Sequence, residues 1–127
     1  MTREDKQLLL QDLCARLPYG VQVCYKIHLE DELIDVTLSG LLLDYFNNKT
    51  VVEIKPYLRP MSSMSEEERN EYFNVKMQEC ERVALSETYR PEAISVVFDW
   101  LNAHHFDYRG LIDLGLALSA PEEMYNK

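Results

Sequence analysis

The segment FDWLNAHHFDYRG holds two adjacent histidines, His104 and His105, followed closely by the acid Asp107. These side chains could bind a metal ion or transfer protons. Neighbouring positions on a helix point about 100° apart, so the two rings cannot both reach one ion while the helix continues through them. The H-E-x-x-H pattern, in which two histidines share one helix face, is absent. A metal-binding protein or small hydrolase that uses His104 or His105 with Asp107 is therefore the alternative to a structural role.

In the structural interpretation, the two histidines close a helix. His104 follows Trp100 by four residues and His105 follows Leu101 by four, so each ring can lie on an apolar side chain of the preceding turn. The ring nitrogens can then meet the open carbonyl groups of the helix end. We predict this role, with no bound metal and no cofactor.

The second candidate site is Tyr57, Leu58 and Arg59, which lie between Pro56 and Pro60. Prolines restrict the backbone on both sides, and tyrosine and arginine are enriched at protein interfaces. These three residues are predicted to contact a partner protein. A packed connection between sheet and helix is the alternative.

Other catalytic patterns are missing. The chain has no G-x-S-x-G, no Walker loop and no G-x-G-x-x-G. Its three cysteines are far apart in sequence, which favours reduced thiols over a disulfide framework. These features favour a protein that is not an enzyme.

The charge balance disfavours nucleic acid as a ligand. The chain has 22 acidic and 13 basic residues, a formal net charge of -9, and its basic residues are scattered singly. Such a field repels phosphates, although it could also imitate them, so an acidic mimic of nucleic acid is a further alternative. The leucine cluster near the N-terminus is interrupted by polar residues, so we expect no signal peptide, no membrane contact and a cytoplasmic protein.

The first half of the chain is expected to form a helix and a sheet. Thr2 and Asp5 form a capping box for a helix that ends before Pro18. Alternating apolar residues from Val21 to Glu30 then predict a strand. With short links between them, four strands should form a curved antiparallel meander or partial barrel over residues 21–30, 33–38, 41–46 and 50–54. The prolines of 55–60 should end this sheet.

Two helices are expected in the second half. Ser65 and Glu68 form a capping box for the first, which should reach Leu85 and bury one apolar face, Phe73, Met77, Cys80 and Ala84. The second should begin at Arg90-Pro91 and end near His104 or His105, after which Asp107 caps a short turn that Gly115 closes. Both helices should pack over one face of the sheet. The whole chain, residues 1–127, is thus predicted to be one α+β domain.

Three segments resemble a known family: LCARLPYGV at 13–21, KPYLRPMSSMSEEE at 55–68, and FDWLNAHHFDYRGLIDLGLALSAPEEMY at 98–125. The family comprises small uncharacterised proteins of anaerobic gut bacteria, their prophages and other mobile elements. The matching segments cover about two-fifths of the chain, whereas 23–54 and 74–92 differ from the family in length and composition. The resemblance implies a cytoplasmic accessory protein from a phage or mobile element, with no established activity to transfer. We predict a protein-binding or regulatory role, with an exposed apolar or tyrosine-rich patch and no deep polar pocket.

Overall fold

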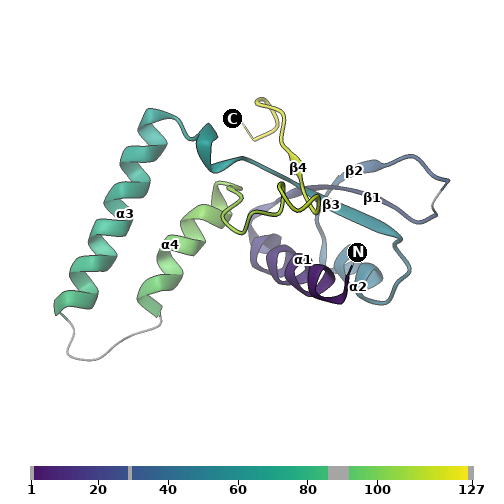
Figure 1. Cartoon of the computed structure of the whole chain (residues 1–127), viewed down its shortest axis with the longest axis horizontal. Helices are drawn as coiled ribbons and strands as arrows, with labels where there is room; N and C mark the ends of the chain where they lie inside the picture. Colours follow the sequence, from purple (N-terminus) through teal and green to yellow (C-terminus); the bar gives the residue numbers. More distant parts are fainter. Residues whose placement is uncertain (1, 29, 86–91, 126–127) are drawn as a thin grey trace.

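The computed structural model describes residues 2–28, 30–85 and 92–125, with the backbone alone for 80–85 and 92–95. Helices and strands follow one another along the chain (Figure 1) as α1 Arg3–Arg16, β1 Gln22–Lys26, β2 Ile34–Thr37, α2 Gly40–Asn47, β3 Glu53–Leu58, α3 Glu66–Leu85, α4 Glu92–Ala103 and β4 Leu118–Ser119. Short 3-10 turns at Leu17–Tyr19 and Met61–Ser63 follow α1 and precede α3. The expected capping boxes of Thr2 with Asp5 and of Ser65 with Glu68 are both formed.

The sheet has four strands in the order β2-β1-β3-β4 and is not closed. β1 pairs antiparallel with both β2 and β3, whereas β4 pairs parallel with β3. The α+β class and the N-terminal helix are confirmed. The sheet is mixed rather than wholly antiparallel, because its fourth strand comes from the C-terminal segment.

The strand expected at 41–46 is wrong, because this segment is the helix α2. Ser39 caps the helix by accepting a hydrogen bond from the Leu42 backbone N–H at 3.1 Å. Leu42 and Phe46, four residues apart, are buried on one face. An unbroken run of leucines fits a buried strand and a buried helix equally well, so the cap decides between them.

The expectation that the prolines end the sheet is also wrong, because β3 continues through Pro56 to Leu58. The Leu38 N–H donates to the Val21 carbonyl at 2.9 Å, so β1 residues of odd number face β2 and those of even number face β3. Val23, which lies opposite Pro56, therefore exchanges no hydrogen bonds with β3. The proline nitrogen faces the other side, where pairing with β4 begins only at Tyr57.

The main core lies between the sheet and the two helices α1 and α2 (Figure 1). It contains buried apolar side chains from every part of this layer, among them Leu9, Leu13, Val21, Val23, Phe46, Ile54, Leu58 and Leu111. A second, smaller cluster of Met64, Leu101 and Phe106 lies at the base of α3 and α4. The described side chains are therefore buried in two separate clusters.

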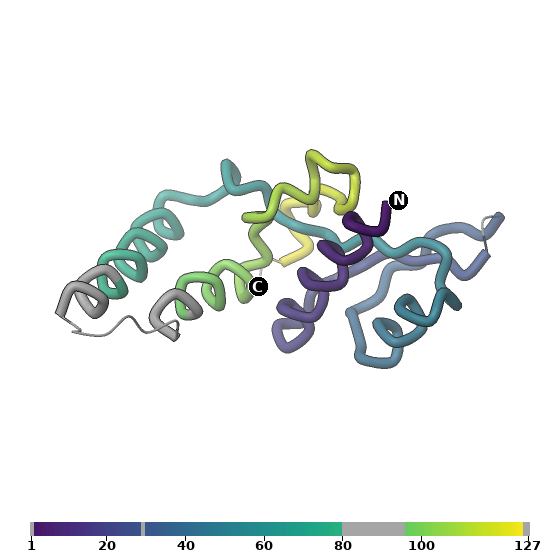
Figure 2. Tube along the Cα trace, turned by 60° about the horizontal axis from the view of Figure 1, so that its bottom comes forward, coloured from purple at the N-terminus to yellow at the C-terminus, as the bar shows by residue number. Residues whose placement is uncertain are grey.

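Helices α3 and α4 form a hairpin that projects to one side of the body in both views (Figures 1 and 2). The expectation that they cover a sheet face is therefore wrong. Phe73 and Met77, predicted to be packed, have 61% and 46% of their surface exposed. The other two residues of that predicted face, Cys80 and Ala84, and the predicted helix start at Arg90-Pro91 lie outside the described side chains. Within the described chain, no helix has the length and apolar character needed to cross a membrane.

Candidate functional site

The two predicted segments, 57–59 and 104–107, meet in space. The Arg59 N–H donates to the carbonyl of His105 at 2.8 Å, and the Asp107 N–H donates to the carbonyl of Arg59 at 2.8 Å. Arg59 and Phe106 thus form an isolated parallel bridge that joins the end of β3 to the chain after α4. Both segments therefore contribute to one site.

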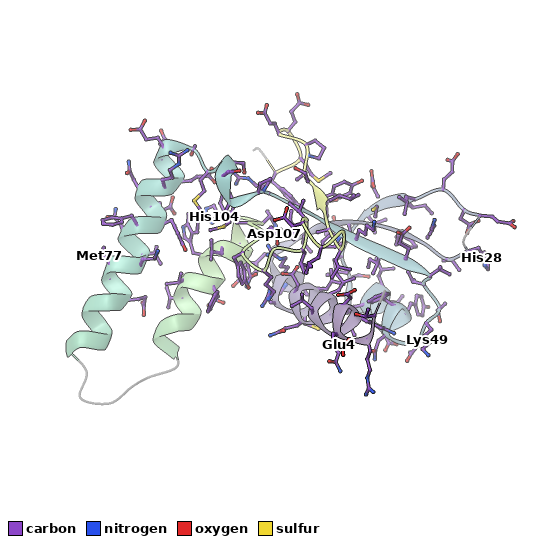
Figure 3. All side chains as sticks on the ribbon, viewed as in Figure 1. Glu4, His28, Lys49, Met77, His104 and Asp107 are labelled. Atoms are coloured by element: carbon purple, nitrogen blue, oxygen red, sulfur yellow. The ribbon has the colours of Figure 1, made fainter. Side chains whose placement is uncertain are left out.

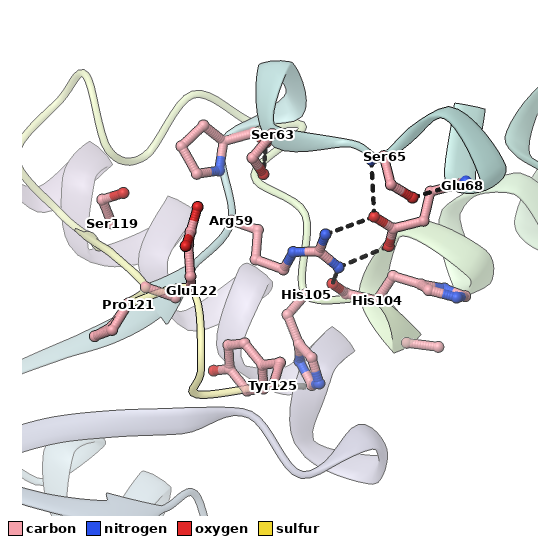
Figure 4. Close-up of a pocket in the computed structure, with 13 residues that line it drawn as sticks. Arg59, Ser63, Ser65, Glu68, His104, His105, Ser119, Pro121, Glu122 and Tyr125 are labelled. Carbon is pink, nitrogen blue, oxygen red and sulfur yellow. Dashed lines mark hydrogen bonds and ion pairs between the residues drawn. The ribbon is translucent and has the colours of Figure 1, made fainter. Parts of the chain in front are cut away.

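A hollow of about 920 Å³ opens at this junction (Figure 4). Its lining comes from the turn before α3, the end of α4 and the C-terminal segment, and includes Arg59, Ser65, Glu68, His104, His105 and Tyr125. This polar hollow differs from our expectation of no deep polar pocket.

Arg59 is held on two sides. Its guanidinium donates to both carboxylate oxygens of Glu68, at 2.8 and 2.7 Å, and lies 4.2 Å from the centre of the Phe106 ring. The hydrogen bond from Arg59 lowers the pKa of Glu68 to about 2. The positive charge of Arg59 is therefore already paired and is not free to hold an anion.

The other two residues of the predicted binding surface are also held within the fold. Leu58 is fully buried, so its side chain cannot contact a partner. The Tyr57 hydroxyl donates to Asp35 at 2.8 Å, which together with burial raises the pKa of Tyr57 to about 12. Cys24 lies beside this hydroxyl, and burial raises the pKa of its thiol. A protonated, buried thiol is a poor nucleophile.

His104 has the predicted structural role. Its ring stacks on Trp100 with the centroids 4.0 Å apart, and its Nδ1 lies 2.8 Å from the Trp100 carbonyl oxygen. The helix end and the aromatic ring thus fix the imidazole.

His105 differs from the prediction. Its backbone has φ 64°, a left-handed conformation that turns the side chain away from the face of α4. The ring stacks on Tyr125 at 3.8 Å instead of on Leu101. Burial, with the positive charge of Arg16 as the next cause, lowers the pKa of His105 to about 4. The imidazole is therefore neutral at pH 7, and its buried Nδ1 has no hydrogen-bond partner among the described residues.

Asp107 caps the turn that follows, as predicted. Its two carboxylate oxygens accept hydrogen bonds from the backbone N–H groups of Leu111 and Ile112, at 2.9 and 3.0 Å. His104, His105 and Asp107 thus have three separate sets of contacts. Across the described ranges, no group of three or more His, Cys, Asp or Glu side chains is placed to hold a metal ion.

Tyr125 is a site residue that the sequence analysis missed. Its hydroxyl accepts from the Gln22 N–H at 2.9 Å and donates to the Tyr57 carbonyl at 2.7 Å. Gln22 and Tyr57 are the next pair in the β1–β3 register, so the hydroxyl stands in for a direct hydrogen bond between the strands. No sequence signal predicted this contact, because it depends on where an irregular segment crosses the sheet.

A buried charge network behind the hollow was also missed. Arg16 and Asp12 are fully buried and 2.9 Å apart, and Arg109 donates to the second Asp12 oxygen at 2.7 Å. Arg16 also donates to the carbonyl of Phe106 at 2.6 Å. Opposite charges four residues apart on a helix were a readable signal, but exposed helices show the same spacing.

Burial and hydrogen bonding shift the pKa values of three groups that line the hollow. Three of its titratable groups have pKa values far from neutrality, about 2 for Glu68, about 4 for His105, and about 12 for Tyr125 because of its burial. No protein-family model matches the chain, and no curated protein or solved structure is significantly similar to it. Function therefore has to be inferred from the residues themselves.

Proposed function

We propose that the protein is a non-enzymatic binding module that holds a partner protein against its projecting helical hairpin. The observation that supports this role is the exposed pair Phe73 and Met77 on α3, with 61% and 46% of their surface accessible. Exposed apolar residues that cluster on one face are typical of protein interaction sites. We call Phe73 and Met77 the α3 stripe.

The α3 stripe lies on the side of α3 that faces away from α4. Tyr72 marks the inner side, because its ring is 5.4 Å from that of Trp100, and Glu79 on the same side is buried. At about 100° per residue, Met77 lies about 140–160° around the helix from these two residues and Phe73 about 100–120°, so Met77 is nearly opposite them and Phe73 is on the adjoining flank. Met77 is labelled on the projecting hairpin in Figure 3.

The spacing of the stripe indicates the shape of the partner. Side chains four residues apart on a helix form a ridge that an apolar helix of another protein can pack against. Val96 and Phe98 on α4, 40% and 43% exposed, extend the apolar character of the hairpin. As part of the same proposal, the resemblance to proteins of gut anaerobes and their mobile elements implies a host or phage protein as the partner, and a cytoplasmic location.

The test compares capture by the wild type with capture by a variant that lacks the stripe. Tagged wild type and the double variant Phe73→Ser, Met77→Ser are incubated with lysate of an anaerobic gut bacterium, and bound proteins are quantified by mass spectrometry. We expect a protein that the wild type enriches and the variant loses at least tenfold, and that binds the purified wild type directly. Leu114→Ser, at another exposed leucine with 56% accessibility, should retain it. Equal capture by wild type and the double variant would refute the role of the stripe.

The surface predicted from sequence is tested in the same assay. Tyr57→Ala with Arg59→Ala should have a smaller effect than loss of the stripe, because both side chains are bonded within the fold.

Two other functions stay predictions. The separate contacts of His104, His105 and Asp107 do not support a hydrolase or a metal-binding protein. Elemental analysis of the purified protein tests whether a metal ion is bound. A mimic of nucleic acid rests on the net charge alone.

A further inference from the structure

Among the described residues, β2 forms an edge of the sheet with no further strand paired to its outer side. It stands at one end of the strand order, next to β1 only (Figure 1). The opposite edge differs, because β4 and the Ala120 N–H, which donates to Leu58 at 2.8 Å, cover β3. Open edges expose backbone groups that can pair with another chain.

The hydrogen-bond pattern shows which groups of β2 are open. The bond from the Leu38 N–H to Val21 places every second residue of β2 against β1, namely Ile34 and Val36. The N–H and C=O groups of Asp35 and Thr37 therefore point outward. They present two donors and two acceptors, the pattern that an added strand requires.

The side chains of β2 alternate between two environments. Val36 packs against the core on the helix-covered face, where Ile34 keeps 50% of its surface exposed. Asp35 and Thr37 point to the other face, where Asp35 accepts from Tyr57 and Thr37 from Gln22. A strand added to this edge would thus place alternate side chains beside an apolar and an acidic neighbour.

The charge around this edge favours a basic partner. Glu30, Asp31 and Glu32 are all exposed in the turn that leads into β2, and the chain carries a formal charge of -9. A second copy would bring the same charge to the edge and be repelled. A segment with lysine or arginine would be attracted.

We propose that the β2 edge binds an extended segment of a partner protein in which basic and apolar residues alternate. The segment pairs with the backbone of Asp35 and Thr37 as a fifth strand. Its basic side chains lie on the face of Asp35 and its apolar side chains beside Ile34. This site is separate from the α3 stripe and stands or fails independently of it.

The probe is a capped octapeptide of alternating lysine and valine, titrated into the whole chain at low salt. By nuclear magnetic resonance we expect slower hydrogen exchange at the amides of Asp35 and Thr37, which face outward, and little change at Ile34 and Val36. A peptide with glutamate in place of lysine, and one with four lysines followed by four valines, should bind at least tenfold more weakly. A short edge strand that carries an acid also serves to prevent pairing. If the hydrogen-exchange rates of the Asp35 and Thr37 amides stay unchanged, β2 serves to prevent pairing and the proposal is overturned.

Two variants separate backbone pairing from charge attraction. Thr37→Pro removes an outward backbone N–H that does not bond to β1, so the fold should persist while binding is lost. It also removes the hydroxyl that accepts from the Gln22 side chain, so Thr37→Val, which keeps the N–H, is its matched control and should still bind. Glu30→Gln, Asp31→Asn and Glu32→Gln together should weaken binding about tenfold and keep the Asp31 oxygen that accepts from the His28 N–H. If the proline variant does not fold, the charge variant still tests the proposal. Glu122→Gln with Glu123→Gln, on the C-terminal segment, is the control and should bind as the wild type does. Equal weakening by this control, or a dimer formed without peptide, would overturn the proposal.

Discussion

The ring of Tyr125 stacks on that of His105 with centroids 3.8 Å apart and planes inclined by 17°. This contact joins the C-terminal segment to the end of α4. Because the hydroxyl of the same tyrosine also connects Gln22 to Tyr57, one side chain ties the hairpin base, β1 and β3 together. Tyr125, which lines the hollow, therefore also holds these parts of the fold together.

Tyr125→Phe should destabilise the protein by about 1–3 kcal/mol. The phenylalanine ring can keep the stack on His105, but the Gln22 N–H and the Tyr57 carbonyl lose their shared partner at a partly buried site. Urea denaturation followed by circular dichroism measures the free energy of unfolding. Tyr45→Phe, at a tyrosine with 43% exposure, is the control and should change it by less than about 0.5 kcal/mol. Equal effects of the two substitutions would contradict the bridging role.

His105 should make the protein less stable as the pH falls below about 6.5. Its pKa is about 4 in the folded chain against an ordinary 6.5, so between these values the unfolded state binds a proton that the folded state does not. The contribution of His105 to the free energy of unfolding is therefore fully present above pH 6.5 and is lost as the pH falls toward 4. Between pH 7.5 and pH 5 we expect a loss of about 2 kcal/mol from this group.

The measurement is a series of urea denaturations from pH 7.5 to pH 5, above the range in which Glu68 titrates. His105→Asn tolerates the left-handed backbone and removes the titrating ring, so it should flatten the slope whatever its absolute stability. His28→Asn, at an exposed histidine, should keep the wild-type slope. A slope that survives in His105→Asn would assign the pH dependence to another group.

Asp12→Ala should be among the most damaging single substitutions, with a loss of about 3–5 kcal/mol. It leaves the fully buried Arg16 without its carboxylate and also removes a partner of Arg109. Thermal and urea unfolding measure the loss, with the exposed Asp113→Ala as control. A double-mutant cycle with Arg109→Ala gives the part of the energy that belongs to that pair. A cost below about 1 kcal/mol would show that the network is not buried as described.

Local signals predicted some elements well. Both capping boxes lie within a few residues, so Thr2 with Asp5 and Ser65 with Glu68 mark helix starts whatever the rest of the chain does. Ser39 caps α2, but a serine before an apolar run fits a link between two strands equally well, so it does not separate a helix from a strand at 41–46. β4 has two residues and is defined only by its parallel partner β3, so no periodicity could reveal it.

The site was predicted in parts but not as a whole. The stack of His104 on Trp100 and the cap formed by Asp107 follow from spacing along the chain. The meeting of Arg59 with the segment after α4 does not, because 45 or more residues separate them. His105 stacks on Tyr125 because its backbone is left-handed, and a histidine in the sequence does not predict that conformation.

The α3 stripe should contribute little to stability, which separates a binding surface from a core. Phe73→Ser and Met77→Ser should each cost about 1 kcal/mol or less of the free energy of unfolding, because both side chains keep a large part of their surface in water when the chain folds. Leu101→Ala, at the 2% exposed centre of the cluster beneath the hairpin, should cost about 2–5 kcal/mol. Urea denaturation of the three variants measures the difference. If the stripe variants cost as much as Leu101→Ala, the hairpin packs on another part of the chain in solution and its outer face is not free for a partner.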